Sequence, residues 1–191
     1  MKISLLALLV FATPASALAA AQLPTPMGLS FGSNLKAATA RLAKLKAKVS
    51  TEEKDQLGLH GKNYKYTKVE AAFKTGPIEQ VKLYFYDEKL TRMKVQSRNE
   101  KPPVNTEKLG KPGLLSPTGH AFWWNPEELT GIACHRSATK PPRGRCEIFD
   151  MRVLVGVLGN RHQIEVQFQT LVQGTIEQVE KVRKASPASA P

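Results

Sequence analysis

The residues of this sequence best suited to chemistry lie between its two cysteines, Cys134 and Cys146. They enclose HRSATKPPRGR, which carries four Lys or Arg residues and no acidic one. Two thiols at this spacing can form a disulfide, help to bind a metal, or provide a thiolate nucleophile. A disulfide is the expected state in an exported chain, because disulfides persist in oxidising compartments. Such a bridge contributes about 3 kcal/mol of stability by restricting the unfolded chain.

Zinc binding and hydrolysis are the alternatives for this region. Cys134, His135 and Cys146 lie close in the sequence, but adjacent side chains of a strand point to opposite faces, which disfavours a shared zinc ion. His120, His135 and Glu147 are the candidates for an envelope hydrolase. No His-Glu-x-x-His or phosphate-binding loop motif occurs. Binding is therefore favoured over catalysis, and no metal or cofactor is expected.

The four bases between the cysteines are candidate binding residues. Pro141-Pro142 stiffens their segment, which lowers the entropy lost on docking, and arginine forks bind carboxylates or phosphates through two hydrogen bonds. A rigid basic loop is suited to the acidic cleft of a protein partner. The alternative is a solvated hairpin tip whose charges prevent the flanking strands from aggregating. The bases are Arg136, Lys140, Arg143 and Arg145.

Trp123 and Trp124 form a second candidate site. Neighbouring side chains of a strand face opposite sides, so at least one indole is expected in the core. The other can stack on a sugar, a lipid interface or a protein partner. Core packing of both indoles, through a twist or bend, is the alternative.

The N-terminus, MKISLLALLVFATPASALAAAQ, has the order of a secretory signal peptide over residues 1–21. Lys2 precedes an apolar run that is too short to span a bilayer, and small residues follow it. No cysteine follows these small residues, so no lipid anchor is expected. The sequence predicts a periplasmic or secreted protein with one domain over 22–184 and a disordered tail over 185–191.

The formal net charge of +12 indicates attraction to anionic surfaces. Lys36, Arg41, Lys44, Lys46 and Lys48 make the region from 35 to 49 the most basic helical surface expected. It can bind lipopolysaccharide or an acidic glycan, and nucleic acid is not the expected physiological partner. A solvated outer face that recruits nothing is the alternative.

Periodic apolar residues predict the elements that would position these sites. Leu35 to Val49 repeats at three- and four-residue steps, which predicts a helix of about four turns. Ser50 and Glu53 have capping-box spacing, which predicts a short helix over 51–57. Strands follow over 63–98, with a bulge near Thr67, and a connector rich in Pro and Gly spans 99–119.

The second half of the sequence predicts further strands. They cover HAFWW and LTGIACHR, then RCEIFDMRVLVGVL and HQIEVQFQTL, and a short helix opens at Thr175. The expected fold class is α+β, with a mainly antiparallel sheet, an amphipathic N-terminal helix and short additional helices packed on one face. Two sub-halves joined by 99–119 are possible within the single domain.

The layout of residues 27–98 resembles known periplasmic modules. A Gly-x-x-Phe-Gly opening from Gly28 to Gly32 leads into an amphipathic helix, a second short helix and strands ending in FYDEKL. This order is similar to that of BamE and of the β-lactamase inhibitor class. The resemblance implies helices on an antiparallel sheet and a role in binding proteins, as an inhibitor, an immunity factor or an accessory of envelope assembly. No functional residue is carried over, because the chain lacks the lipid-attachment cysteine of BamE and adds a long second half.

Overall fold

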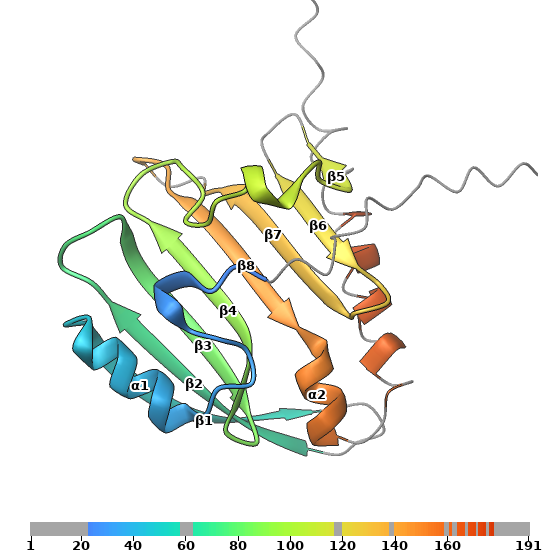
Figure 1. Cartoon of the computed structure of the whole chain (residues 1–191), viewed down its shortest axis with the longest axis horizontal. Helices are drawn as coiled ribbons and strands as arrows, with labels where there is room; N and C mark the ends of the chain where they lie inside the picture. The colour runs from blue at the N-terminus through green and yellow to red at the C-terminus, as the bar shows by residue number, and fades with distance from the viewer. Residues whose placement is uncertain are drawn as a thin grey trace, which may run out of the picture.

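One antiparallel sheet of eight strands, with a few short helices, forms the protein (Figure 1). The computed structural model describes residues 23–57, 63–116, 120–137, 140–158, 161, 164–166, 168–170, 172–174 and 176–177. The expected leader and C-terminal tail lie outside these described residues. The fold is therefore α+β with a mainly antiparallel sheet, as the sequence predicts.

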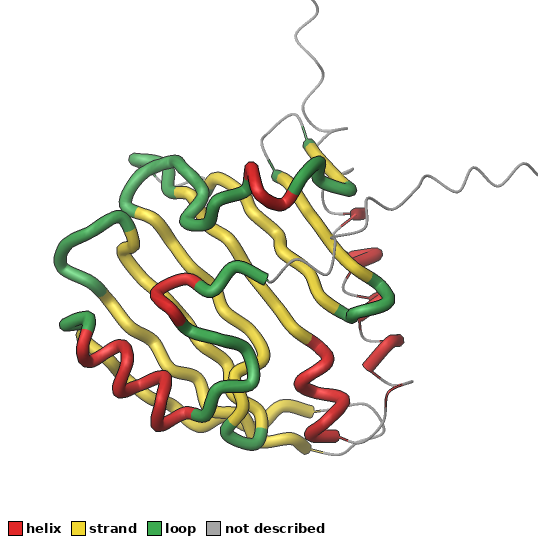
Figure 2. Tube along the Cα trace, in the orientation of Figure 1, coloured by secondary structure: helices red, strands yellow, loops and turns green. Residues whose placement is uncertain are grey.

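The strand order is β1-β2-β3-β4-β8-β7-β6-β5, so two four-stranded meanders meet where β4 pairs with β8. Figure 2 shows the strands as one continuous sheet. The strands are β1 (Lys48–Leu57), β2 (Asn63–Ala72), β3 (Ile78–Tyr86), β4 (Lys89–Ser97), β5 (Leu114–Leu115), β6 (Ala121–Asn125), β7 (Thr130–Arg136) and β8 (Gly144–Asp150). The helices are η1 (Pro26–Gly28), α1 (Leu35–Lys44), η3 (Glu107–Leu109) and α2 (Met151–Leu158).

One face of the sheet is covered along its whole width, and we call it the covered face. The N-terminal segment and α1 lie in front of it in Figure 1, and the connector between the two meanders packs on it as well. Strict alternation along the strands supplies its apolar side chains, which are fully or almost fully buried. They include Val69, Val81, Leu83, Phe85, Met93, Val95, Ile132 and Ile148.

Helix α1 is shorter than the sequence predicts. The side chain of Asn34 caps its start by accepting a 2.7 Å hydrogen bond from the backbone N–H of Ala37, and Ala38 and Leu42 are buried against the sheet. It ends at Lys44 because Lys46 takes a left-handed conformation, with φ of 56°. Val49, expected on the same helix, lies instead in β1.

The expected helix over 51–57 and the bulge near Thr67 are wrong. Residues 48–57 form β1, which pairs with β2 in unbroken register from Lys48 opposite Ala72 to Leu57 opposite Asn63. A capping box gives a weak local preference, and ten paired residues outweigh it. The register shifts lie between β3 and β4 instead.

The strands expected beyond Asp150 are also wrong, since α2 spans Met151–Leu158 and the described residues from 161 to 177 are helical. The Asp150 carboxylate starts α2 by accepting a 3.0 Å hydrogen bond from the backbone N–H of Arg152. Ile164 and Phe168 are 1 % exposed, whereas Val166 between them is 42 % exposed. This is the four-residue spacing of a helix and not strand alternation.

Helices lie on both faces of the sheet, which corrects the expectation of one helical face. Leu154, Ile164 and Phe168 pack with Phe122 and Phe149, whose side chains point away from the covered face. Within the described residues, this helical layer packs mainly on the half of the second face that β5 to β8 form, and it reaches β4 and Tyr86 of β3 at its edge. No described helix is long and apolar enough to cross a membrane.

Candidate binding site on the open sheet face

The disulfide expected from the sequence is present. Cys134 and Cys146 are directly opposed on β7 and β8, and both are buried within the covered face. The oxidised pair has no thiolate to offer for metal binding or nucleophilic attack. The described residues contain no cluster of His, Cys, Asp or Glu that could hold a metal ion. The bridge therefore serves to hold the β7–β8 hairpin together.

The four bases of the bridged segment separate in space. Arg136 forms a 3.1 Å ion pair with Glu100 of the connector. Arg143 donates to the backbone carbonyl of Arg98 and lies 3.7 Å from Glu79. Arg145 sits on β8, while Lys140 is exposed near the tip of the hairpin. The segment does not present its bases as one projecting group.

Both indoles pack within the protein. Trp123 is 5 % exposed on the covered face, and its Nε1–H donates a 3.1 Å hydrogen bond to the carbonyl of Gly110. Trp124 points to the other face, where it stacks on Phe122 with ring centroids 5.0 Å apart and contacts the helical layer. The expectation that at least one indole lies in the core holds for Trp123, and Trp124 is only partly exposed.

The second face of β1 to β4, with the adjoining part of β8, is not covered by the described helices, and we call it the open face. Its outward residues are largely charged or aromatic. Lys48 lies on this side at the end of β1, and the central part of the face carries six Lys or Arg, three Glu and two Tyr. The cations are therefore in excess by three. These residues are Glu52, Lys54, Tyr66, Lys68, Glu70, Lys82, Tyr84, Arg92, Lys94, Arg145 and Glu147.

Ion pairs link many of these side chains across neighbouring strands. Lys68 bridges Glu52 at 2.8 Å and Glu70 at 3.0 Å, and Lys82 pairs with Glu70 at 3.1 Å. Hydrogen bonds from Lys68 and then Lys82 hold the pKa of Glu70 below its usual range. Hydrogen bonds from Lys68 and then Lys54 lower the pKa of Glu52 as well, so Glu52 and Glu70 stay ionised and fix the lysine side chains above the strands.

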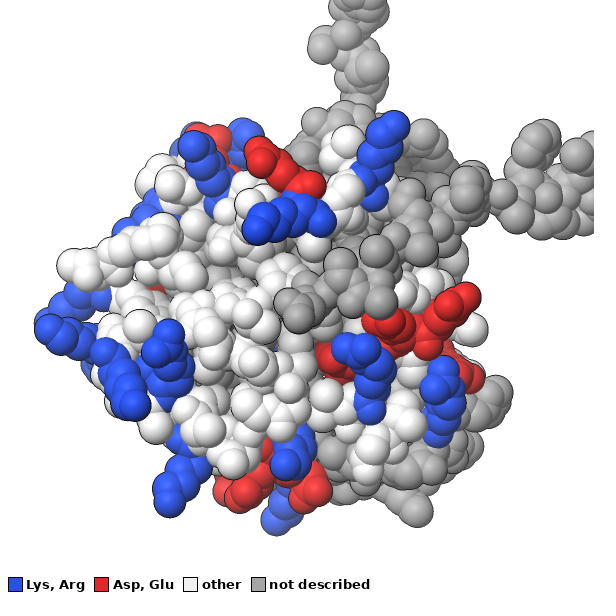
Figure 3. All heavy atoms as spheres, viewed as in Figure 1, with Lys and Arg blue, Asp and Glu red and all other residues white. Residues whose placement is uncertain are grey.

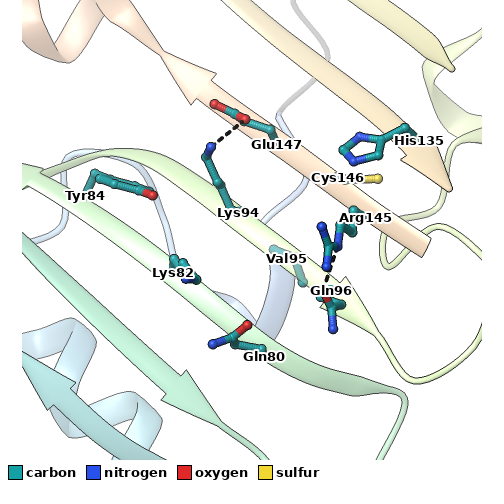
Figure 4. A pocket seen from close by; sticks show the side chains of 10 residues that line it. All are labelled: Gln80, Lys82, Tyr84, Lys94, Val95, Gln96, His135, Arg145, Cys146 and Glu147. Atoms are coloured by element: carbon teal, nitrogen blue, oxygen red, sulfur yellow. Dashed lines mark hydrogen bonds and ion pairs between the residues drawn. The ribbon is translucent and has the colours of Figure 1, made fainter. Parts of the chain in front are cut away.

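The strand register builds a depression of about 400 Å³ in the middle of the open face (Figure 4). One cross-strand row runs from Gln80 through Gln96 and Arg145 to His135, and a second runs from Lys82 through Lys94 to Glu147. Tyr84, in the next outward row along β3, lines the end of the depression. Its floor is the backbone of Val95 and Cys146, whose side chains point to the covered face.

Hydrogen-bond donors face into this depression from three strands. The Nε–H of Arg145 donates a 2.7 Å hydrogen bond to Gln96 Oε1, and its terminal nitrogens make no hydrogen bond with the described residues. The guanidinium of Arg92 lies 4.9 Å from the centre of the Tyr84 ring, which fixes the orientation of that ring. Lys82 and Lys94 add two cations. The arrangement can bind a carboxylate or phosphate group whose neighbouring hydroxyls reach the amides.

His135 is the titratable group of the depression with a shifted pKa. Partial burial lowers it below the usual range, and repulsion from His120 and Arg145 lowers it further. Its ring stacks on that of His120, with the centroids 5.4 Å apart. His135 is therefore neutral at pH 7 and can donate or accept a hydrogen bond.

Sequence reasoning finds Arg145 but misses its partners in the depression, chiefly Lys82, Tyr84 and Lys94. A signal for them exists, because the outward positions of VKLYFY and TRMKVQ carry Lys, Tyr, Arg and Gln but no acid. His135 and Glu147, considered above for hydrolysis, both line the depression, whereas His120 lies outside its lining and stacks on His135. That signal predicts neither the register of the paired strands nor which face of the sheet the helices cover.

Comparison with protein-family models, with curated proteins and with solved structures found no match. The function is therefore inferred from the geometry and charge of the described residues.

Proposed function

We propose that this chain is an exported, non-catalytic binding protein of the bacterial envelope whose open face binds an acidic glycan. The observation that carries the proposal is the depression with its rows of cationic and amide side chains on a sheet face that the described helices leave uncovered. An acidic sugar combines the groups that this site can contact, namely an anion, several hydroxyls and an apolar ring face.

Each class of side chain in the depression has a partner in such a ligand. Arg145 and Lys94 suit a carboxylate or sulfate, Gln80 suits ring hydroxyls, and Tyr84 offers an aromatic surface to a sugar ring. A volume of about 400 Å³ lies in the range of small-ligand sites. The surrounding face is open, so a polymer can continue along it in both directions.

The carboxylates of the site favour binding over hydrolysis. Glycosidases use two carboxyl groups that flank the scissile bond. Glu147 is the one acidic residue that lines the depression within the described part of the chain, and it is paired with Lys94 at 3.2 Å and with Arg92. Both oxygens of that carboxylate are engaged by cations, and the described lining offers no second carboxyl group to complete a glycosidase pair.

Replacing three cations of the depression should abolish most of the affinity for an acidic glycan. For Lys82→Gln/Lys94→Gln/Arg145→Gln we expect Kd for oligogalacturonate to rise at least tenfold in calorimetry at low salt, because each charge-assisted contact is lost. Affinity of the wild type should fall as salt increases.

The matched control removes the same charge elsewhere. Lys44→Gln/Lys46→Gln/Lys74→Gln alters exposed lysines away from the depression and should change Kd less than about threefold. Equal losses in the two variants would show that net charge alone draws the glycan and would contradict the proposed site. Capture of a protein and not a glycan from an envelope extract, by the wild type alone, would instead favour a protein partner.

Glycan affinity should also increase as the solution is acidified below pH 6.5. His135 is neutral at pH 7, and its protonation adds a positive charge beside Lys94 and Arg145. Glu147 favours this charge, and the ring of His120 is stacked on His135. Since the bound anion favours the charged imidazole, Kd should fall about two- to fivefold between pH 7.5 and pH 5. His135→Gln should flatten this dependence, and an unchanged profile in that variant would refute the role of His135.

A further inference from the structure

A second basic surface lies at the end of the sheet where α1 ends, and we call it the basic corner. Figure 3 shows basic side chains gathered at this edge, on the left of the molecule. All four of its lysines are exposed, and none forms an ion pair with a described residue. The basic corner consists of Lys44, Lys46, Lys48 and Lys74.

The fold brings these lysines together from two separate segments. Helix α1 ends at Lys44, the left-handed residue Lys46 reverses the chain, and β1 begins at Lys48. Lys48 is opposite Ala72 in β2, so Lys74, two residues beyond, reaches the same end of the sheet. The basic surface expected along one helix is therefore a corner between a helix end and a strand turn. Arg41 of α1 is turned aside, since its Nε–H donates a 2.9 Å hydrogen bond to the carbonyl of Met27.

An exposed leucine lies between two of these lysines in the sequence. Leu45 is 36 % exposed and is flanked by Lys44 and Lys46. Among the described residues only Leu115 and Val166 are comparably exposed large apolar side chains, and neither has a lysine beside it in the sequence. Solubility explains the lysines but not the leucine. An anionic bilayer explains both, because lysines contact the lipid phosphates while an apolar side chain enters the interface.

We infer that the basic corner binds the surface of an anionic phospholipid bilayer, with Leu45 entering the headgroup region. The four residues of the corner are all lysines, without the amides that line the depression of the open face, so the corner fits a plane of headgroups better than a sugar. It lies at the strand ends and not over the depression, so the chain can hold a membrane and a glycan together. This inference does not depend on the proposed function, because it rests on different residues.

Vesicle co-sedimentation tests the inference with protein purified after export, from which the expected leader has been removed. The wild type should bind vesicles of phosphatidylglycerol and phosphatidylcholine in equal parts and should not bind pure phosphatidylcholine. Lys44→Gln/Lys46→Gln/Lys74→Gln should weaken binding at least tenfold, since each lysine near an anionic surface contributes about fivefold. Binding that is retained by this variant would overturn the inference.

Two single variants with unchanged charge test the apolar contact. Leu45→Ser should weaken vesicle binding about three- to tenfold, whereas Leu115→Ser, which alters a leucine 65 % exposed elsewhere, should leave it unchanged. Equal binding by Leu45→Ser and the wild type would exclude insertion of Leu45. The open-face variant Lys82→Gln/Lys94→Gln/Arg145→Gln should keep vesicle binding, and a loss as large as that of the corner variant would show non-specific attraction.

Discussion

Removing the disulfide by Cys134→Ala/Cys146→Ala should lower the free energy of unfolding by about 3 kcal/mol. The bridge closes a loop between residues 12 positions apart, and its loss restores conformational freedom to the unfolded chain. Both cysteines are buried in the apolar cluster on the covered face, so removal of their sulfur atoms also leaves a small cavity. For a chain of this size the melting temperature should fall by about 6–12 °C.

Urea unfolding of the double variant, beside the wild type with and without reductant, measures this effect. The reduced wild type should approach the stability of the double variant, while reductant should leave the double variant unchanged. A difference below about 1 kcal/mol would mean that backbone pairing of β7 with β8 alone holds the hairpin.

Gly144→Ala should destabilise the fold by about 1–3 kcal/mol or more, by overpacking. A Cβ atom at this position would lie 2.0 Å from the carbonyl oxygen of Lys101, which is backbone and cannot turn aside. Gly144 also donates a 2.6 Å hydrogen bond to the carbonyl of Asn99, and its own carbonyl accepts one from the hydroxyl of Ser97. The added methyl group must therefore push the connector away from β8.

Gly156→Ala is the matched control in α2, where no atom of the described residues, apart from the helix's own nearby backbone, lies within 4 Å of the added Cβ. This substitution should raise stability by about 0.5–1 kcal/mol, because alanine favours a helix over glycine. Thermal unfolding of both variants separates the two effects. A Gly144→Ala protein as stable as the wild type would show that the connector does not pack tightly on β8.

The parts of the fold that could be predicted are those in which a local pattern has one solution. Val81, Leu83 and Phe85 alternate strictly with polar residues, and all three are buried in β3. The region after Asp150 has two solutions. Apolar residues at 164, 166 and 168 have the spacing of an alternating strand. Those at 164 and 168 alone have the four-residue spacing of a helix, and their packing against the aromatic residues of the sheet selects the helix.

The prediction of a helix over 51–57 is wrong for a different reason. Ser50 and Glu53 do have the spacing of a helix capping box. The charged residues of the segment also pair with opposite charges on β2, as the Glu52–Lys68 ion pair shows. The segment therefore forms a strand because of its contacts with β2. A prediction from local sequence does not include those contacts. The layout on which the resemblance to BamE rests includes a second helix here, and that helix is absent.

The candidate site could be predicted only in its residue types. The depression needs Gln96 beside Arg145 and Lys94 beside Glu147, which requires β4 to pair with β8 across about 50 residues of sequence. It also needs the C-terminal helices to cover one half of that face and leave the other half uncovered. The sequence predicts Arg145 on a loop tip beside Arg136 and Lys140, because the three residues are close in sequence. The strand register separates them, since Arg145 lies within β8.

Backbone amide NMR shifts during titration with oligogalacturonate test the central claim most directly. The account predicts shifts concentrated at Lys82, Tyr84, Lys94 and Arg145, on three neighbouring strands of the open face. Residues 136–143 and the basic corner should change little. Shifts confined to that loop or to the corner, with the open face unaffected, would contradict the assignment of the open face as the glycan-binding site.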